Sequence, residues 1–212
     1  CGGGSYGCRM GMKICELDDP NNTVNWVYLY DYLIELIKSG RIKLDKSVNE
    51  GKRFTWHDSC KHGRELERHY GRGFFEEPRW ILNQCVDDFV DMVPNRMNAF
   101  CCGAGGGMWP APYEDESAWH GRKKYESIKE AKADVVVLGC SNCHDQLMKR
   151  IPKYYTDHKY EVKYIWELVA DSLVLDPWTE EEIEKGRAEA EAQWERLGVE
   201  LDDDDDWQPP EE

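Results

Sequence analysis

Hydrophobic residues recur with two different periods along this chain. Residues 26–38 carry apolar side chains at the spacing of one helix face, at Trp26, Tyr30, Leu33 and Ile37. Ser39 and Gly40 then supply a stop signal. Residues 133–140, "ADVVVLGC", are continuously apolar and β-branched, which is typical of a strand covered on both faces. The pattern therefore predicts a helix packed on a buried sheet.

The rest of the first 175 residues alternates between the same two kinds of segment. "RFTWHDSC", residues 53–60, predicts a short strand ending at Cys60, and "MNAFCC" predicts a second. Helices are expected in "RELERHYG", "EEPRWILNQC", "NCHDQLMKRI" and "VKYIWELVADSL", and in a segment capped by Ser117 that runs through Tyr125, Ile128 and Ala131. Strands alternating with helices predict an α/β fold, a Rossmann-like parallel sheet.

The C-terminal segment has a different composition. Residues 176–212 contain 16 acidic and 3 basic residues, which accounts for −13 of the total net charge of −15. We expect a polar helix from about Thr179 to Leu197, opened by a capping box of Thr179 and Glu182. This tail is either a solvated charge run or a surface for a partner subunit. Nucleic-acid binding, which needs a basic face, has little support.

Nine cysteines raise the question of redox setting. Their number is odd, the start of the chain does not resemble a signal peptide, and no apolar run reaches the ~18 residues of a membrane span. These features favour a reducing, cytoplasmic setting in which thiols bind metal or react. Cys1 with the following glycines is an odd beginning, so we expect the chain to be the C-terminal part of a longer protein.

Five of the cysteines follow predicted strands. These are Cys60, the adjacent pair Cys101 and Cys102, and the Cys140 to Cys143 turn. Ligands of an open parallel sheet bind beyond the carboxyl ends of its strands, so we expect the five thiols to converge there. Neighbouring cysteines fit a disulfide poorly. The glycines that follow, Gly103, Gly105, Gly106 and Gly107, would let the backbone approach a bulky inorganic group.

Two kinds of metal centre suit such a thiol set. A C-x2-C turn is a familiar half of a zinc site, but structural zinc closes at four ligands. Five thiols, two of them adjacent, suit several metal atoms better, as in an iron–sulfur cluster. A zinc-stabilised scaffold stays as an alternative.

The spacing C-x40-CCG-x36-C-x2-C, with the segments "HDSC", "NRMNAFCCGAGGG" and "VVLGCSNC", resembles the cysteine-rich CCG domain of heterodisulfide reductases. The finer resemblance is to the catalytic iron–sulfur subunits of sulfate-reducer membrane redox complexes, of the DsrK, Hmc and Tmc types. It implies a [4Fe-4S] cluster, noncubane or modified cubane, that splits a disulfide by one-electron steps. Residue by residue, it implies ligand roles for Cys60, Cys101, Cys102, Cys140 and Cys143, with Gly103 beside the cofactor.

The resemblance also implies an organisation and a setting. Residues 1–50 would be the remnant of an upstream CCG-type half with a connecting helix, 51–175 the iron–sulfur domain, and 176–212 an acidic tail. The partners would be other iron–sulfur subunits and a membrane cytochrome b-type subunit, which would hold the chain at the cytoplasmic face without membrane insertion. The substrate would be a small-molecule heterodisulfide, or a disulfide or trisulfide on a small sulfur-carrier protein. A non-catalytic electron relay is the alternative function.

Other residues have two interpretations each. His57, three residues before Cys60, either protonates a departing thiolate as a catalytic group or hydrogen-bonds its loop. His144 either donates to a cluster sulfur or begins a helix. Cys85 is expected to be a buried apolar residue, and structural roles are also expected for Cys8 and Cys15. Arg9 and Lys13 would attract an anionic substrate or form an ordinary surface.

Overall fold

The computed structural model describes residues 10, 11, 14, 27–106, 111–175 and 177–198. Its contacts divide the chain into two compact units, Cys1–Val174 and Leu175–Glu212. The expectations for Cys1, Cys8, Cys15, Arg9, Lys13, Gly107 and the end of the acidic tail fall outside the described residues.

A three-stranded parallel sheet forms the centre of the first unit. Its strands are β1 (Phe54–Trp56), β2 (Val135–Leu138) and β3 (Glu161–Tyr164), in that spatial order. Phe54 pairs with Val135, and Val135 pairs with Glu161. The predicted α/β class with a parallel sheet is confirmed, although β1 ends at Trp56, earlier than residues 53–60 suggested.

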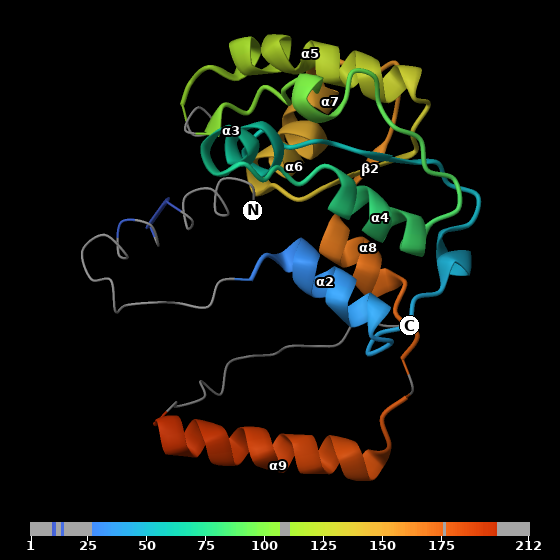
Figure 1. Ribbon diagram of the computed structural model, residues 1–212, viewed down its shortest axis with the longest axis vertical. Coiled ribbons are helices and arrows are strands. Elements are labelled where there is room, and N and C mark those ends of the chain that lie inside the picture. The colour runs from blue at the N-terminus through green and yellow to red at the C-terminus, as the bar shows by residue number, and fades with distance from the viewer. Residues whose placement is uncertain (1–9, 12–13, 15–26, 107–110, 176, 199–212) are drawn as a thin grey trace. The chain divides into compact units, whose positions relative to one another are not determined.

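Helices cover both faces of this sheet. Figure 1 shows α5 and α7 on one side of β2, with α2, α4 and α8 on the other. The α-helices described in this unit are α2 (Leu29–Lys38), α3 (Leu66–Tyr70), α4 (Glu76–Cys85), α5 (Glu114–Glu130), α6 (Ser141–Asp145), α7 (Ile151–Tyr154) and α8 (Ile165–Asp171). Shorter turns are the 3₁₀ segments η1 (Lys46–Asn49) and η3 (Arg96–Asn98).

The alternation of side chains along β2 separates two cores. Val135 and Val137 pack with β1, α2, α4 and α8, in a cluster that includes Cys85. Val136 and Leu138 pack with α5, α7 and the segments around Cys102, Cys140 and Cys143. All four residues of β2 are fully buried, as expected of a strand covered on both faces.

The predicted strand "MNAFCC" is wrong. Residues 96–98 form η3 and the backbone runs on to Cys102 without strand pairing. Arg96 has a positive φ of 54°, which turns the chain away from an extended path. A side chain satisfies carbonyls that a strand would pair, because Arg64 donates to Met97 O (3.5 Å) and Ala99 O (2.5 Å). Cys101 and Cys102 therefore lie on an irregular segment.

Two helix boundaries also differ from expectation. Helix α5 begins at Glu114, so Ser117 is a buried residue inside the helix and does not cap it. The segment 162–173 was expected to be helical throughout, but its start belongs to β3 and α8 begins only at Ile165. The Glu167 carboxylate accepts from the Tyr164 N–H (2.7 Å), which fixes this strand-to-helix junction.

Two helical segments that begin near cysteines contain a π-helical turn. The first, η2 (Lys61–Glu65), starts directly after Cys60 and continues into α3. The second, η5 (Gln146–Arg150), joins α6 to α7. Turns of this kind are rare and are found frequently at functional sites.

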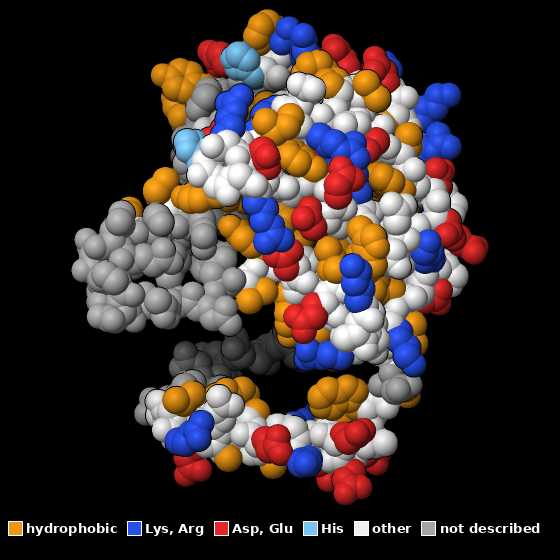
Figure 2. Space-filling view, viewed as in Figure 1, with side chains coloured by type: hydrophobic (Ala, Val, Ile, Leu, Met, Phe, Trp, Pro, Cys, Tyr) orange, Lys and Arg blue, Asp and Glu red, His pale blue; other side chains and the backbone are white. Residues whose placement is uncertain are grey.

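The second unit contains α9 (Glu180–Leu197), in which no residue is buried. Thr179 accepts from the Glu182 N–H (3.3 Å) and Glu182 accepts from the Thr179 N–H (2.9 Å), so the predicted capping box is confirmed. Figure 2 shows acidic and basic side chains interspersed over the visible face of the first unit, without a continuous basic stripe. Within the described parts of the chain, no helix is both long and apolar enough to cross a membrane.

Candidate metal centre

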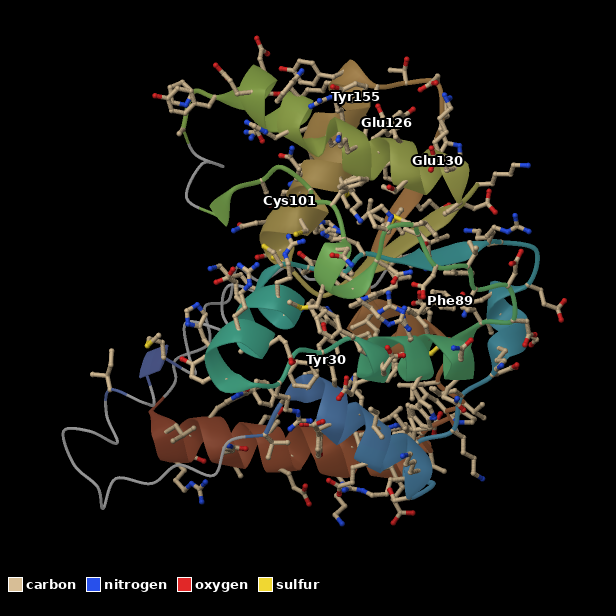
Figure 3. All side chains as sticks on the ribbon, turned by 45° about the horizontal axis from the view of Figure 1, so that its top comes forward. Tyr30, Phe89, Cys101, Glu126, Glu130 and Tyr155 are labelled. Carbon is tan, nitrogen blue, oxygen red and sulfur yellow. The ribbon has the colours of Figure 1, made fainter. Side chains whose placement is uncertain are left out.

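The five cysteines singled out in the sequence come from three loops. Cys60 directly precedes η2 and lies four residues after β1 ends. Cys101 and Cys102 lie on the irregular segment after η3, and Cys140 directly precedes α6, whose first turn carries Cys143. In Figure 3, Cys101 lies between α5 and α3. The carboxyl ends of β1 and β2 thus supply three of the thiols, and packing of the irregular segment supplies the other two.

These five side chains form one continuous chain of contacts. The Sγ atoms of Cys102 and Cys143 are 3.1 Å apart, too far for a disulfide bond of about 2 Å. Cys101 is hydrogen-bonded to both Cys102 and Cys60, and Cys143 is hydrogen-bonded to Cys140. We call this set the cysteine chain. The convergence expected from the sequence is therefore present in the fold.

One thiol in the cysteine chain differs from its neighbours in charge. Hydrogen bonds from Cys102 and Cys60, together with the Gly103 N–H at 3.3 Å, hold the pKa of Cys101 far below that of an ordinary thiol. The donated hydrogen bond to Cys101 and burial raise the pKa of Cys60, and contacts with Cys102 and Cys140 raise that of Cys143. Cys101, which is exposed to solvent, is thus the thiolate of the set.

Buried polar atoms without hydrogen-bond partners occur on β1 and the loop after it, and those of His57 lie beside two of the thiols. Among the described residues, they are Thr55 Oγ1, Ser59 Oγ and both ring nitrogens of His57. A ring nitrogen of His57 and the Sγ atoms of Cys102 and Cys143 all lie within 4.8 Å of one another. Buried polar atoms are normally paired, so this group indicates a place where something else completes the bonding.

The loop that carries His57 is held by a buried ion pair. Both Asp58 oxygens accept from the Arg79 guanidinium at 2.8 Å, and the two side chains are 3% and 5% exposed. Asp58 also accepts from Trp56 Nε1 (3.1 Å) and from the Arg96 N–H (2.7 Å). One carboxylate therefore joins the end of β1, helix α4 and the segment leading to Cys101.

The glycine after the cysteine pair is required by packing against α5. Gly103 has a φ of 88°, and a Cβ built on it would lie 2.3 Å from Ser117 O. Gly121 meets the same loop from the other side, since its Cβ would lie 2.4 Å from Cys102 O. The close approach that Gly103 permits here is to a helix backbone. It fixes Cys102 against the first turns of α5.

A second glycine has a similar role before Cys140. A Cβ on Gly139 would lie 2.2 Å from the Tyr30 hydroxyl and 2.8 Å from the His62 ring. Tyr30 Oη and His62 Nδ1 are hydrogen-bonded at 2.9 Å, and both side chains are buried. This pair supports the backbone that leads into the Cys140 to Cys143 turn from the α2 side of the sheet.

Lys124 is a buried cation close to the cysteine chain. Its side chain, on α5, is 1% exposed, and its Nζ lies 3.9 Å from Met92 Sδ. Burial lowers the pKa of Lys124 to about 8, against the opposing effect of Asp58 and of the thiols of Cys102 and Cys143. Burial likewise lowers the pKa of His57 to about 3, and the Lys124 charge adds to this effect.

The side chains of the two remaining predicted residues pack against other groups. His144 is part of α6, and its ring stacks on Tyr164 with centroids 4.4 Å apart. This geometry agrees with the interpretation that His144 begins a helix. Cys85 ends α4 within the other core, and burial raises its pKa to about 11. It is the buried apolar residue that the sequence suggested.

Sequence reasoning missed Asp58, Arg79 and Lys124. A signal for Lys124 was available, since it lies at helical spacing with the buried positions Ser117, Gly121 and Ile128. A lysine is almost never fully buried unless it is paired with another group. The pairing of Asp58 with Arg79 spans 21 residues and left no local pattern.

Comparison with known proteins agrees with this geometry. Residues 54–148 match the family model of the cysteine-rich domain called CCG. Over 150 residues the chain is 31% identical to a subunit of the dihydromethanophenazine:CoB–CoM heterodisulfide reductase of Methanosarcina barkeri, covering 70% of this chain and 34% of the relative. Over 85 residues it is 38% identical to an Hdr-like menaquinol oxidoreductase iron-sulfur subunit of Archaeoglobus profundus, covering 39% and 14%.

A further relative carries a different name. It is the EtfAB:quinone oxidoreductase of Syntrophomonas wolfei, 30% identical over 147 residues, covering 64% of this chain and 19% of the relative. The chain spans about a third or less of the length of these curated relatives. The matched segment runs from the first residue of β1 into η5 and includes all five residues of the cysteine chain. Residues 54–148 therefore form a cysteine-rich domain of the CCG family.

Proposed function

We propose that this chain is part of an iron–sulfur oxidoreductase of the heterodisulfide reductase type, in which the cysteine chain holds the cluster. The observation that carries the proposal is the continuous contact of five thiols from three loops, with Cys102 and Cys143 3.1 Å apart. A structural zinc site uses four ligands and leaves no role for a fifth thiol.

The residues present fit such a group. Thiolates are the usual ligands of iron–sulfur clusters, and Cys60, Cys101, Cys102, Cys140 and Cys143 would provide them. His57, whose ring nitrogens have no hydrogen-bond partner, lies beside Cys102 and Cys143, where it would donate a hydrogen bond to sulfur. When bound, a [4Fe-4S] group would supply single electrons for the reduction of a sulfur–sulfur bond, with noncubane and modified cubane forms both compatible with five thiols.

The chain's own residues would orient the substrate and handle protons. Splitting a disulfide into two thiols takes two electrons and two protons. Cys101 is the one exposed thiol among the five, so a substrate sulfur would approach from its side. His57 is the candidate proton donor, but its pKa of about 3 means that the ring is neutral near pH 7. Proton donation by His57 would therefore require negative charge beside the ring to favour its protonated form.

The relatives' names support a proposal about the assembly. One of them is a heterodisulfide reductase subunit, and others act with menaquinol or quinone. We propose that this chain receives electrons from further iron–sulfur and membrane-bound cytochrome b-type partners at the cytoplasmic face of a membrane. The substrate would be a small-molecule heterodisulfide, or a disulfide or trisulfide on a small sulfur-carrier protein.

Iron and zinc analysis of single variants tests the site. The chain is reconstituted anaerobically with iron and sulfide, and metal per chain and visible absorption are measured. We expect Cys102→Ser to lose most of the iron and the absorption. Cys85→Ser is the matched control, since Cys85 is equally buried but lies in the other core, and it should retain both. Equal losses in the two variants, or stoichiometric zinc without iron, would contradict the proposal.

An electron relay is the second candidate, because Cys102, Cys140 and Cys143 are all buried. A buried cluster passes electrons without contact with a substrate. Adding a substrate thiol to oxidised, reconstituted protein distinguishes the two functions by electron paramagnetic resonance. A new signal broadened by iron-57 supports disulfide chemistry. A signal that stays unchanged with every thiol added supports the relay.

A further inference from the structure

The side chain of Lys124 lacks the partner that a buried ammonium group normally has. It is 1% exposed, and its Nζ contacts the Met92 thioether at 3.9 Å. In the part of the chain that the structure describes, no carboxylate forms an ion pair with it. Burying a cation without a compensating anion is strongly unfavourable. The surroundings of Lys124 must therefore supply negative charge in another form.

The carboxylate whose charge acts most strongly on Lys124 is already engaged. Asp58 accepts two hydrogen bonds from Arg79, one from the Trp56 indole and one from the Arg96 N–H. Arg79 forms two parallel hydrogen bonds to Asp58 and also pairs with Asp91. A carboxylate accepts about four hydrogen bonds, so Asp58 has no acceptor site left for Lys124.

The other groups that act on Lys124 are thiols of the cysteine chain. Lys124 lies one helical turn after Gly121, which packs against Cys102 O, and Met92, which its Nζ contacts, belongs to the same core cluster as Cys102 and Cys143. Cys102, Cys143 and Cys101 act on its charge next after Asp58, and Lys124 also acts on His57. The buried ammonium group therefore lies on the side of α5 that packs against the cysteine chain. The thiolate ligands of an iron–sulfur cluster carry more negative charge than its core carries positive charge. The cluster with its ligands is therefore an anion, and in the loaded protein it would lie next to Lys124.

We propose that Lys124 is the buried counter-charge of the cysteine chain, and that its ammonium group raises the reduction potential of the cluster held there. The inference rests on the proposed function, because it takes the bound group to be an iron–sulfur cluster. A nearby cation favours the reduced, more negative state. Net charge and solvent exposure are among the factors that set the potential of such clusters. Lys124 is a positioning and charge-compensating residue, and it is not assigned to touch the substrate.

A redox titration of reconstituted variants tests this inference. Lys124→Met removes the charge and keeps a long apolar side chain in the core, and Lys124→Arg keeps the charge. The matched control is Lys123→Met, which removes a lysine from the next position of the same helix, where the side chain is exposed. Midpoint potentials are read from cluster absorption and electron paramagnetic resonance, iron is measured per chain, and circular dichroism checks the fold.

We expect Lys124→Met to lower the reduced-to-oxidised ratio at least tenfold at the wild-type midpoint, which is a shift of about 59 mV for one electron. Lys124→Arg and Lys123→Met should stay near the wild-type value. An unchanged midpoint in Lys124→Met, or an equal shift in Lys123→Met, overturns the inference. If Lys124→Met does not bind iron, the inference requires that Lys124→Arg does. Equal loss of iron in the two variants overturns the inference. Absence of iron from the wild-type protein would instead reject the proposed function.

Discussion

Buried cations have different partners on the two faces of the sheet. On the face covered by α2, α4 and α8, the buried cation Arg79 is paired with Asp58 and Asp91. On the face covered by α5 and α7, the buried cation Lys124 has a thioether and the cysteine chain around it. The cysteines differ in the same way, because Cys85 is an isolated core residue whereas Cys102 contacts two other thiols.

This difference indicates that one face of the sheet stabilises the fold and the other binds the ligand. The α4 face satisfies its polar groups with its own side chains, so it can hold the loop of Asp58 in place. On the other side, the Thr55 hydroxyl is unpaired, and the unpaired ring of His57 lies beside two thiols. Side chains alternate across a strand, so Thr55 faces away from the core of Phe54 and Trp56. We infer that the first face is the support and the second is the ligand side.

The largest expected effect on stability comes from removing the buried ion pair of Arg79 and Asp58. Arg79→Met leaves the Asp58 carboxylate buried without its partner, and we expect the free energy of unfolding to fall by about 3–5 kcal/mol. Urea denaturation followed by circular dichroism measures the change. Arg96→Met is the control, because the side chains of Arg96 and its partner Glu76 are 39% and 68% exposed, and such pairs contribute about 0–1 kcal/mol. Similar losses in both variants would contradict the division between the two faces.

A smaller effect should follow from pushing the cysteine loop away from α5. Gly103→Ala and Gly51→Ala both place a Cβ on a residue with positive φ, which costs about 1–2 kcal/mol. Only the Gly103 variant also meets backbone at 2.3 Å, whereas Gly51 has nothing within 4 Å. We expect the Gly103 variant to be less stable than the Gly51 variant by about 1–3 kcal/mol. The Gly103 variant should also bind less iron, and equal behaviour of the two would remove the packing argument.

The smallest effect is expected from removing residues 176–212. Helix α9 buries none of its residues, and the two faces of the sheet are complete before it. Iron content should be unchanged and the free energy of unfolding should change by less than about 0.5 kcal/mol. Leu168→Ala in α8 gives the scale, since deletion of a fully buried leucine costs about 2–5 kcal/mol. A truncated protein that loses its iron would make the tail part of the domain.

The sequence predicted the strands and helices whose patterns are set by local burial. β2 was recognisable because all four of its side chains are covered, and α9 because Thr179 and Glu182 form a local capping box. The five residues of the cysteine chain were singled out by their positions after predicted strands and by the resemblance to the CCG domain, and their role as ligands stays a prediction. The supporting contacts were not, because each joins residues that are far apart in the chain, as Arg79 joins Asp58.

The wrong strand before Cys101 has a specific physical cause. The run "MNAFCC" is apolar enough for a strand, but burial of Ala99 and Cys102 is achieved by packing without strand pairing. Carbonyl groups there accept hydrogen bonds from the side chain of Arg64. A hydrophobic pattern indicates which residues are buried, but it does not indicate which groups form hydrogen bonds with the backbone.

The π-helical turn η5 has a consequence for how such domains can vary in length. A residue added to or removed from a helix turns everything beyond it by about 100°. The π-helical turn at Gln146–Arg150 winds more loosely and accommodates one residue more than an α-helical turn, with Arg150 donating to Ser117 at 3.0 Å. Ser117 in turn holds Gly103 O, one residue after the cysteine pair. A one-residue deletion should therefore be absorbed within this turn, by a return to α-helical winding, whereas a deletion between Ser117 and Gly121 in α5 would turn Gly121 away from Cys102.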